Sequence, residues 1–389
     1  MTTATPKGVG DLKSRGLTKI EVVCVVVCVG VLLGLLLPAI QEGRDGVSRG
    51  SQCSTNLKNL SLAAIQYADK YGVMPGYAMN FGTHRPSEEM ATALELPTDA
   101  LVEHRKIGTW AVALLPWLDA QPTFEHWTND MFPAVVDDGQ VRFHEAAGPN
   151  LSIMLCPSDS GFSAEDLGQN SYAANVGMSF QNAQGQSPYT IKRLDGTDHS
   201  IDFATSMRIA NGVFHNQVET RLADGKPAWA GPAVRFSDFK DGSGNTVLFS
   251  ENLQSGPWHR VGLSDPAALV ISQGPWVFPS EAPFLQGLVW HWEDEDDESP
   301  APDVNPLHRI NGGDALTMPM TARNASSLAR PSSAHVEGVY VATADGGTRF
   351  IAESLDYIVY QALLTPNGAK SDVPDPSYVL EPDDLAFGR

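Results

Sequence analysis

An apolar stretch near the start of the chain most restricts what it can fold into. Every residue from Val22 to Leu37 is apolar, and the stretch continues past Pro38 to Ile40. A helix of about 20 apolar residues crosses a lipid bilayer, whereas a secretory signal has roughly 7 to 15 apolar residues followed by a small-x-small cleavage site. This stretch is long for a signal, and no Ala-x-Ala follows it. The sequence therefore predicts a transmembrane helix over residues 17–40.

The charges on either side of this stretch predict its orientation. Within residues 1–16, Lys7, Lys13 and Arg15 stand against a single acid, Asp11, while the whole chain of 389 residues has a formal net charge of −20. Because basic flanks stay on the cytoplasmic side, we expect a single-pass protein of the inner (cytoplasmic) membrane with a large extracytoplasmic C-terminal domain. The sequence pI of about 4.8 argues against nucleic acid as a partner, since no basic field is available to displace counterions from phosphates.

The four cysteines fall into two pairs. Cys24 and Cys28 lie one helical turn apart within the predicted span, where small apolar packing residues are expected. Cys53 and Cys156 lie in the exported part, which is an oxidising compartment if the predicted orientation holds. Two readings stay open for this second pair, namely a disulfide or two separately buried thiols.

The helical pattern continues beyond the span, over residues 41–72. The residues that recur at spacings of three and four, and so mark one apolar face, are Leu57, Leu60, Ala64, Ala68 and Tyr71. Gly72, Pro75 and Gly76 predict the end of this helix. Three glycines share one helical side before that face, and either another element packs closely there or the segment is a flexible joint. These are Gly43, Gly46 and Gly50.

Residues 73–365 are predicted to form a mixed and then mostly β domain. "PSEEMATALEL" is typical of a short capped helix, and "GTWAVALLPWLDAQPTFEHW" of a broken amphipathic helix. Short strands are expected at "NGVFHN", "DGSGNTVLFSENL" and "GLVWHW", and a hairpin around Asp345-Gly346-Gly347. "EDEDDESP" has no EF-hand spacing and is expected to be a solvated loop. Residues 366–389, rich in Pro and Asp, are expected to lie along the surface or to lack order.

The sequence holds no catalytic or metal-binding motif that supports an enzyme. The one G-x-S-x-G, at Gly46, Ser48 and Gly50, lies in a helical region rather than between a strand and a helix, and no H-E-x-x-H, Walker loop or paired C-x-x-C is present. His335 and Asp345 could meet, with or without His291 and His308, only through tertiary folding. We therefore expect no catalytic residue, metal or cofactor, and keep an envelope hydrolase using His335 and Asp345 as an alternative.

The segment "RGLTKIE" resembles the class III (prepilin-type) signal, normally G-F-T-L-I-E. The resemblance implies that a prepilin peptidase removes residues 1–16 by cutting after Gly16, and that Leu17 becomes the first mature residue and is N-methylated. Glu21 is then the fifth mature residue, which in pilin-like proteins pairs with the terminal amine of a neighbouring subunit. A carboxylate at the edge of an apolar span is costly and calls for such a partner. The alternatives are that Glu21 snorkels at the interface, or that Lys19 neutralises it within one chain.

Further segments resemble a large bacterial family of unknown function that joins a pseudopilin-like N-terminus to an exported domain. That family's domain ends in an H-x9-DG signature, which here is His335, Asp345 and Gly346. The other matching segments are "SQCSTNLKNLSLAAIQYADKYGVMPG", "TWAVALLPWLDAQ", "LCPSD", "NSYAANVG" and "DGSGNTVLFSEN". The family's closing T-x-x-G-G-E is present only as "TPNGAK".

The resemblance implies an α+β fold, in which a long pilin-like N-terminal helix packs on an antiparallel β-rich domain. It implies a structural or assembly role in a type II secretion or type IV pilus-like envelope system. The expected partners are the inner membrane, prepilin peptidase, and further copies or other pilin-like subunits joined through the N-terminal helix. The alternative is a membrane-tethered extracytoplasmic module that binds a glycan or an envelope protein, for which "GPWVFPS" and "GLVWHW" suggest aromatic surfaces.

Overall fold

The computed structural model describes residues 19–128, 131–163, 166–182, 184–263, 265–292, 310–312, 318–381 and 384, without the side chains of residues 21, 30–48 and 98. The chain divides into two units, residues 1–48 and 49–389, and the second holds the fold and the sites considered below. The predicted leader, with Gly16, and Leu17 lie outside the described residues, as do His308 and the acidic run 293–300.

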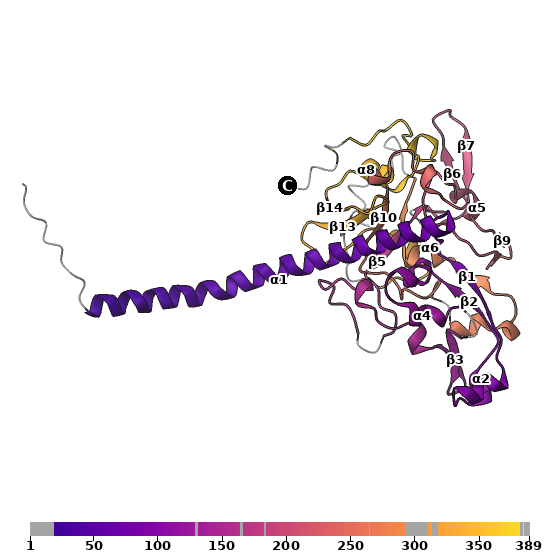
Figure 1. Ribbon diagram of the computed structural model, residues 1–389. Helices are drawn as coiled ribbons and strands as arrows, with labels where there is room; N and C mark the ends of the chain where they lie inside the picture. The colour runs from indigo at the N-terminus through magenta and orange to yellow at the C-terminus, as the bar shows by residue number, and fades with distance from the viewer. Residues whose placement is uncertain are drawn as a thin grey trace, which may run out of the picture. The chain divides into compact units, whose positions relative to one another are not determined.

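Eight helices and fourteen strands are present in the described residues, together with short 3-10 turns (Figure 1). The helices are α1 Lys19–Tyr71, α2 Glu88–Ala93, α3 Trp110–Leu114, α4 Gln121–Glu125, α5 Phe203–Ser206, α6 Ala282–Leu285, α7 Ala325–Leu328 and α8 Tyr357–Leu364. The strands are β1 Met79–His84, β2 His104–Gly108, β3 Ala134–Asp137, β4 Gln140–Phe143, β5 Tyr172–Met178, β6 Tyr189–Lys192, β7 Asp198–Ile201, β8 Thr220–Leu222, β9 Pro227–Ala228, β10 Val247–Glu251, β11 Val277–Phe278, β12 Gly287–Trp290, β13 Gly338–Thr343 and β14 Thr348–Ala352.

Helix α1 contributes its C-terminal part, from Arg49 onward, to the second unit. Leu57, Leu60, Ala64 and Ala68 are almost fully buried there, which confirms the predicted apolar face at these positions. Tyr71 differs from the prediction, because it is 52% exposed. The helix ends at Tyr71, as expected from Gly72, which has a positive φ of 77° and whose N–H donates to the Ala68 carbonyl.

A five-stranded sheet forms the centre of the second unit, in the order β12-β5-β10-β13-β14. β12 and β5 pair in parallel, and the other neighbours pair antiparallel. All seven residues of β5 are buried, because the strand lies inside the sheet and both of its faces are covered.

The two faces of this sheet are covered by different helices. One hydrophobic cluster joins α1 residues such as Leu57 and Leu60 to β-strand residues such as Phe249 and Ala342. The other cluster joins Val339 and Val341 of β13 to α8, and Figure 1 shows α8 beside β10, β13 and β14. Alternate residues of β13 thus point to opposite layers, as the pleat of a strand requires. The sheet lies between the C-terminal part of α1 and α8.

The local elements of the second unit test the sequence predictions one by one. The hairpin around Asp345-Gly346-Gly347 is confirmed as β13–β14, and "GLVWHW" contains β12. The capped helix is confirmed as α2, where the Ser87 side chain accepts a hydrogen bond from the Met90 N–H. The predicted strand "NGVFHN" is wrong: the N–H groups of Val213 and Phe214 both donate to the Asn175 carbonyl instead of forming a ladder.

Residues 366–389 are expected to lie along the surface or to lack order. Most of residues 366–381 are half-buried or exposed, but Asp372 is buried, and the Pro366 carbonyl accepts a hydrogen bond from the Lys240 N–H. A buried acid in a Pro- and Asp-rich segment is retained only with hydrogen-bonding partners, which are described below.

Within the described residues, no helix is both long enough and apolar enough to cross a membrane. Of the predicted span 17–40, residues 17 and 18 and the side chains of residues 21 and 30–40 lie outside the described part of the chain.

Candidate functional site

Four side chains from four separate segments meet beside the central sheet. They are Cys53 of α1, Cys156 after the 3-10 turn Ser152–Met154, Glu251 at the end of β10, and His335 just before β13. One potential ligand atom from each lies within 4.8 Å of the others, and we call these four residues the Cys–His–Glu cluster. Each segment belongs to a different motif of the sequence, so the fold gathers motif residues that are up to 282 positions apart into one place.

Cys53 and Cys156 are joined by a disulfide, which is one of the two readings left open by the sequence. Their Cα atoms are 4.8 Å apart, and the two residues are separated by 103 positions. Both are buried, Cys53 completely. The disulfide therefore links the C-terminal part of α1 covalently to the loop that precedes β5.

The loop around Cys156 is held by the rest of the "CPSD" segment. The Cys156 N–H donates to the Ser171 hydroxyl at 2.9 Å, and that hydroxyl donates to Asp159 Oδ2 at 3.2 Å. Burial raises the pKa of Asp159 above its usual value, against the opposing hydrogen bonds from the Gly161 N–H and Ser171. Asp159 thus positions the cysteine loop through Ser171.

Glu251 and His335 form the polar half of the cluster. His335 Nε2 lies 2.9 Å from Glu251 Oε1 and 3.7 Å from Cys156 Sγ. The other carboxylate oxygen, Oε2, accepts the Tyr340 N–H at 2.8 Å. The Glu251 side chain is 2% exposed and that of His335 is 12% exposed, so the imidazole is the most accessible group of the four. One oxygen of Glu251 is thus fixed by the backbone while the other faces the imidazole.

Gly50 allows α1 to approach this cluster closely. A Cβ atom at this position would lie 3.2 Å from the Tyr340 hydroxyl oxygen and 3.7 Å from His335 Cε1. Of the two readings of the glycine-rich side, close packing is therefore the one that the structure gives at Gly50. The side chains of residues 43 and 46 are outside the described part.

The H-x9-DG signature divides between two structural roles. His335 belongs to the Cys–His–Glu cluster, whereas Asp345 forms the β13–β14 turn, where its Oδ1 accepts from the Thr343 hydroxyl at 2.6 Å and the Gly347 N–H at 2.9 Å. The Thr343 hydrogen bond is the main cause of the lowered pKa of Asp345. Gly346 has a φ of 82°, and a Cβ there would lie 3.0 Å from Leu62 of α1. β13 separates His335 from Asp345, and they have different partners.

The sequence analysis missed Glu251 as a site residue. Its signal was present, because Glu251 is the final acid of the "DGSGNTVLFSE" motif, but nothing in the spacing links it to His335, which is 84 positions away. His291 does not join the cluster: its ring nitrogens contact the carbonyls of Gln181 and Ser326, which is a structural role.

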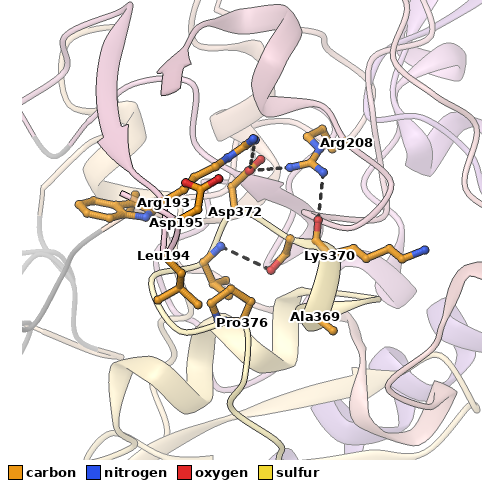
Figure 2. A pocket seen from close by; sticks show the side chains of 11 residues that line it. Arg193, Leu194, Asp195, Arg208, Ala369, Lys370, Asp372 and Pro376 are labelled. Atoms are coloured by element: carbon orange, nitrogen blue, oxygen red, sulfur yellow. Dashed lines mark hydrogen bonds and ion pairs between the residues drawn. The ribbon is translucent and has the colours of Figure 1, made fainter. Parts of the chain in front are cut away.

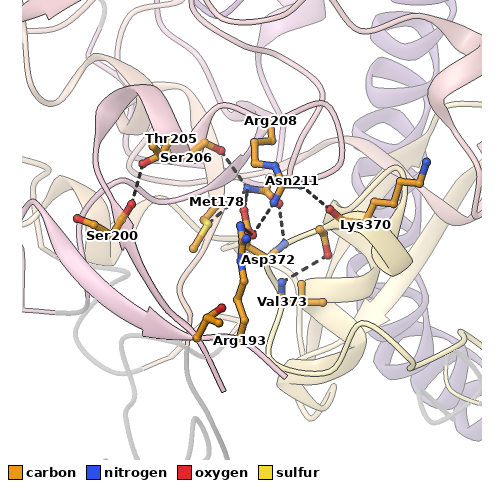
Figure 3. A network of polar contacts seen from close by, with 12 residues as sticks. Met178, Arg193, Ser200, Thr205, Ser206, Arg208, Asn211, Lys370, Asp372 and Val373 are labelled. Carbon is orange, nitrogen blue, oxygen red and sulfur yellow. Dashed lines mark hydrogen bonds and ion pairs between the residues drawn. The ribbon is translucent and has the colours of Figure 1, made fainter. Parts of the chain in front are cut away.

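A second polar arrangement lies at the C-terminal segment, and we call it the Asp372 network. Asp372 Oδ1 accepts from Arg193 at 2.7 Å and from Arg208, and Oδ2 accepts from the Asn211 amide at 3.0 Å (Figure 3). The Asp372 N–H in turn donates to Asn211 Oδ1 at 2.9 Å. Although burial opposes it, these hydrogen bonds and guanidinium charges lower the pKa of Asp372.

A small pocket of about 310 Å³ adjoins the Asp372 network. Figure 2 shows both guanidinium groups directed at Asp372, while the Lys370 ammonium points away and the Lys370 carbonyl accepts from Arg208. Because both arginines are already paired, this pocket offers little free positive charge to an incoming anion.

A larger cleft of about 1080 Å³ lies elsewhere on the second unit, lined by residues that include Phe143, His144, Asp159 and Arg260. The Arg260 guanidinium lies 5.7 Å from the centre of the Phe143 ring. Burial lowers the pKa of His259, which also lines this cleft, to about 3, so its imidazole is neutral. The cleft therefore presents an aromatic ring beside a cation.

Of the three tryptophans in "GPWVFPS" and "GLVWHW", Trp292 is half-buried and lines the pocket beside Asp372, whereas the other two are core residues. Trp276 is 4% exposed and Trp290 is fully buried, where its indole N–H donates to the Asn211 carbonyl at 2.9 Å. Both belong to the hydrophobic core. Trp229, at 55% exposure, is the most exposed tryptophan among the described residues.

The fold is thus a mixed α and β domain with a four-residue cluster at the junction of α1, β10 and β13. A family profile described as a protein of unknown function (DUF1559) matches residues 46–357. The chain belongs to this family, and the match includes all four cluster residues. Searches of characterised proteins and of solved structures each found no match.

Proposed function

We propose that this protein is a membrane-anchored, pseudopilin-like subunit with a structural or assembly role in a type II secretion or type IV pilus-like envelope system. The observation that carries the proposal is "RGLTKIE" directly before an apolar stretch, at the start of one helix that continues from Lys19 to Tyr71. The Cys53–Cys156 disulfide adds support, because it ties the C-terminal part of that helix to the loop that precedes β5. Disulfides persist in oxidising compartments, in keeping with an extracytoplasmic domain.

The proposal assigns prepilin peptidase as the processing enzyme and no catalytic residue to the chain itself. Cleavage follows Gly16, Leu17 is methylated, and Glu21 pairs with the terminal amine of a neighbouring subunit within the inner membrane. The paired carboxylate and amine offset the cost of placing each charge in lipid.

N-terminal processing in the native host tests the proposal. We expect the membrane-purified chain to lack residues 1–16 and to carry one added methyl group, and to retain Met1 in cells without the peptidase. Gly16→Leu should block cleavage, whereas Gly8→Leu, a matched change within the leader, should not. An intact N-terminus in wild-type cells, or a chain released into the medium after a cut beyond Pro38, contradicts the proposal.

Self-association tests the role of Glu21 separately. We expect crosslinked oligomers of the full chain to disappear with Glu21→Ala and to remain with Glu42→Ala, a control acid further along α1. Oligomers that survive Glu21→Ala assign the pairing role elsewhere, for example to Lys19 within the same chain.

The cleft beside Phe143 and Arg260 favours a second candidate, a membrane-tethered module that binds a glycan or an envelope protein. Its volume of about 1080 Å³ suits a ligand of moderate size. A glycan panel added to the purified full-length chain should raise the unfolding temperature for a binding glycan, and Phe143→Ala should abolish that rise. If no glycan in the panel raises the unfolding temperature, the second candidate is reduced to a module that binds an envelope protein.

A further inference from the structure

The four groups of the Cys–His–Glu cluster are the side chains that bind zinc in proteins. Zn²⁺ takes four ligands from thiolates, imidazole nitrogens and carboxylate oxygens, at about 2.3 Å for sulfur and about 2.0–2.2 Å for nitrogen and oxygen. The cluster supplies two sulfur atoms, one imidazole nitrogen and one carboxylate oxygen, all within 4.8 Å of one another. We propose that the dithiol form of this cluster binds one Zn²⁺ ion, and that the disulfide and the metal site are alternative states of the same residues.

The geometry around the sulfurs suits this exchange. His335 Nε2 lies 3.7 Å from Cys156 Sγ, and Glu251 Oε1 lies 2.9 Å from the same nitrogen. When the S–S bond opens, the two sulfur atoms move apart. A zinc ion can then lie between the sulfur, nitrogen and oxygen atoms and be bound by all of them. One potential ligand atom of each residue already lies within 4.8 Å of the others.

The surroundings hold two of the ligands in orientation. The Tyr340 N–H fixes Glu251 Oε2, which leaves Oε1 directed at the cluster, and Ser171 holds the backbone of Cys156. Hydrogen bonds of this kind, from neighbouring groups to the residues that bind the metal, are typical of protein metal sites. His335, with a 12% exposed side chain, is the cluster residue nearest to solvent, so an ion can reach the site past the imidazole.

The chemistry balances in both directions. The chain is synthesised with free thiols, so the dithiol form precedes the disulfide. A dithiol reductant regenerates it: two electrons break the Cys53–Cys156 bond, two protons go to the cysteine sulfurs, and the reductant becomes a disulfide. Zn²⁺ binding then displaces those two protons, because the thiolate is the metal ligand. In the reverse direction a disulfide oxidant takes two electrons from the two zinc-bound thiolates, the S–S bond between Cys53 and Cys156 re-forms, the oxidant takes up two protons to become a dithiol, and Zn²⁺ is released.

The experiment uses the purified full-length chain with Cys24→Ser and Cys28→Ser, so that the two free thiols of α1 cannot bind metal. The chain is reduced with a phosphine, which does not compete for zinc, and titrated with ZnCl₂ alone. We expect one Zn²⁺ per reduced chain, none per oxidised chain, and protection of Cys53 and Cys156 from alkylation by the bound ion. Co²⁺ should give a thiolate charge-transfer band.

Two variants test the ligand set. His335→Ala and Glu251→Gln should each weaken zinc binding by more than the 10–100-fold typical of a lost outer contact. His291→Gln, which changes a buried histidine outside the cluster, should leave the affinity unchanged. The oxidised form of each variant, in which the disulfide is intact, reports whether the fold survives the substitution.

Zinc binding that is absent from the reduced chain, or that is insensitive to both His335→Ala and Glu251→Gln, overturns the proposal and leaves the disulfide as a structural link only. Neither outcome bears on removal of residues 1–16, so the metal site and the pseudopilin-like role fail independently.

Discussion

Two buried carboxylates, Asp372 and Glu251, have contrasting surroundings. The Asp372 side chain is 1% exposed and accepts hydrogen bonds from two guanidinium groups and one amide. The Glu251 side chain is 2% exposed, yet its partners in the described part of the chain are one imidazole and one backbone N–H. A buried negative charge is stable only with a compensating partner, so the first carboxylate is fully paired and the second is paired by a group that need not be charged.

This difference separates a structural network from a candidate site. The Asp372 network ties the C-terminal segment to Arg193 and Arg208, and its charges leave no capacity for a ligand. Glu251 retains an oxygen directed at a histidine and a sulfur atom, which are ligand groups themselves. Substitutions in the Asp372 network should therefore mainly lower the stability of the fold, whereas substitutions at Glu251 should mainly weaken zinc binding by the reduced cluster.

The largest effect on stability is expected from the disulfide. Cys53→Ser with Cys156→Ser should lower the free energy of unfolding by about 2–5 kcal/mol, because the bond closes a loop spanning 103 positions and limits the unfolded chain. The shift of the urea midpoint under non-reducing conditions measures it. Cys24→Ser with Cys28→Ser, which removes two exposed free thiols, is the matched control and should change the midpoint little. Equal midpoints for the two double variants would show that the bond adds nothing to stability.

The next largest effect is expected at Asp372. Asp372→Asn should lower the free energy of unfolding by about 2–3 kcal/mol, because hydrogen bonds to charged groups are worth about 1.5–3 kcal/mol each and both arginines keep partial access to water. Asp195→Asn, an exposed acid on the same pocket, is the control. A result for Asp372→Asn no larger than for Asp195→Asn would contradict the closed network.

The pH dependence of stability sharpens the same comparison. The folded pKa of Asp372 is lowered below its usual value of 3.8, so its contribution to stability is fully present above about pH 4 and is lost as the pH falls through the folded pKa. Urea midpoints of wild type and Asp372→Asn should therefore differ most above pH 4 and converge in stronger acid. A constant difference down to the most acidic pH would exclude the carboxylate charge as the cause.

The elements that the sequence predicted correctly depend on local patterns. The buried face of α1 follows from spacings of three and four, and the β13–β14 hairpin follows from alternation around Asp345-Gly346-Gly347. The predicted strand "NGVFHN" failed because Gly212 packs its backbone against Gly177, where a Cβ would lie 2.5 Å from the Gly177 Cα atom. A close backbone approach leaves no trace in hydrophobic pattern.

The site itself was predictable only in part. The family motifs pointed to His335, Cys53 and Cys156, and the disulfide was one of two readings. The contact between Glu251 and His335 spans 84 positions, and the Asp372 network joins Arg193 to a residue 179 positions later. Such contacts are fixed by strand order and packing, which a single sequence does not encode in its spacing. The buried state of Asp372 was missed for the same reason.

The smallest effect on stability is expected at Glu251. Its size decides whether the Cys–His–Glu cluster is a structural network or a site with available ligand atoms. Glu251→Gln keeps the shape of the side chain and removes only its charge. In the oxidised protein we expect a loss of about 1 kcal/mol, the net value of one typical hydrogen bond, because no arginine or lysine in the described residues pairs with Glu251. The urea midpoint measures this loss against that of Asp372→Asn.

His335→Ala completes the comparison, with an expected loss of about 1–3 kcal/mol, since it leaves a buried carboxylate oxygen without its partner. If Glu251→Gln proves as costly as Asp372→Asn, the charge of Glu251 holds the fold, and the cluster is a structural network like that of Asp372. If the cost stays near that of one neutral hydrogen bond, Glu251 adds little to stability through its charge, and its Oε1 and His335 Nε2 are available as ligand atoms.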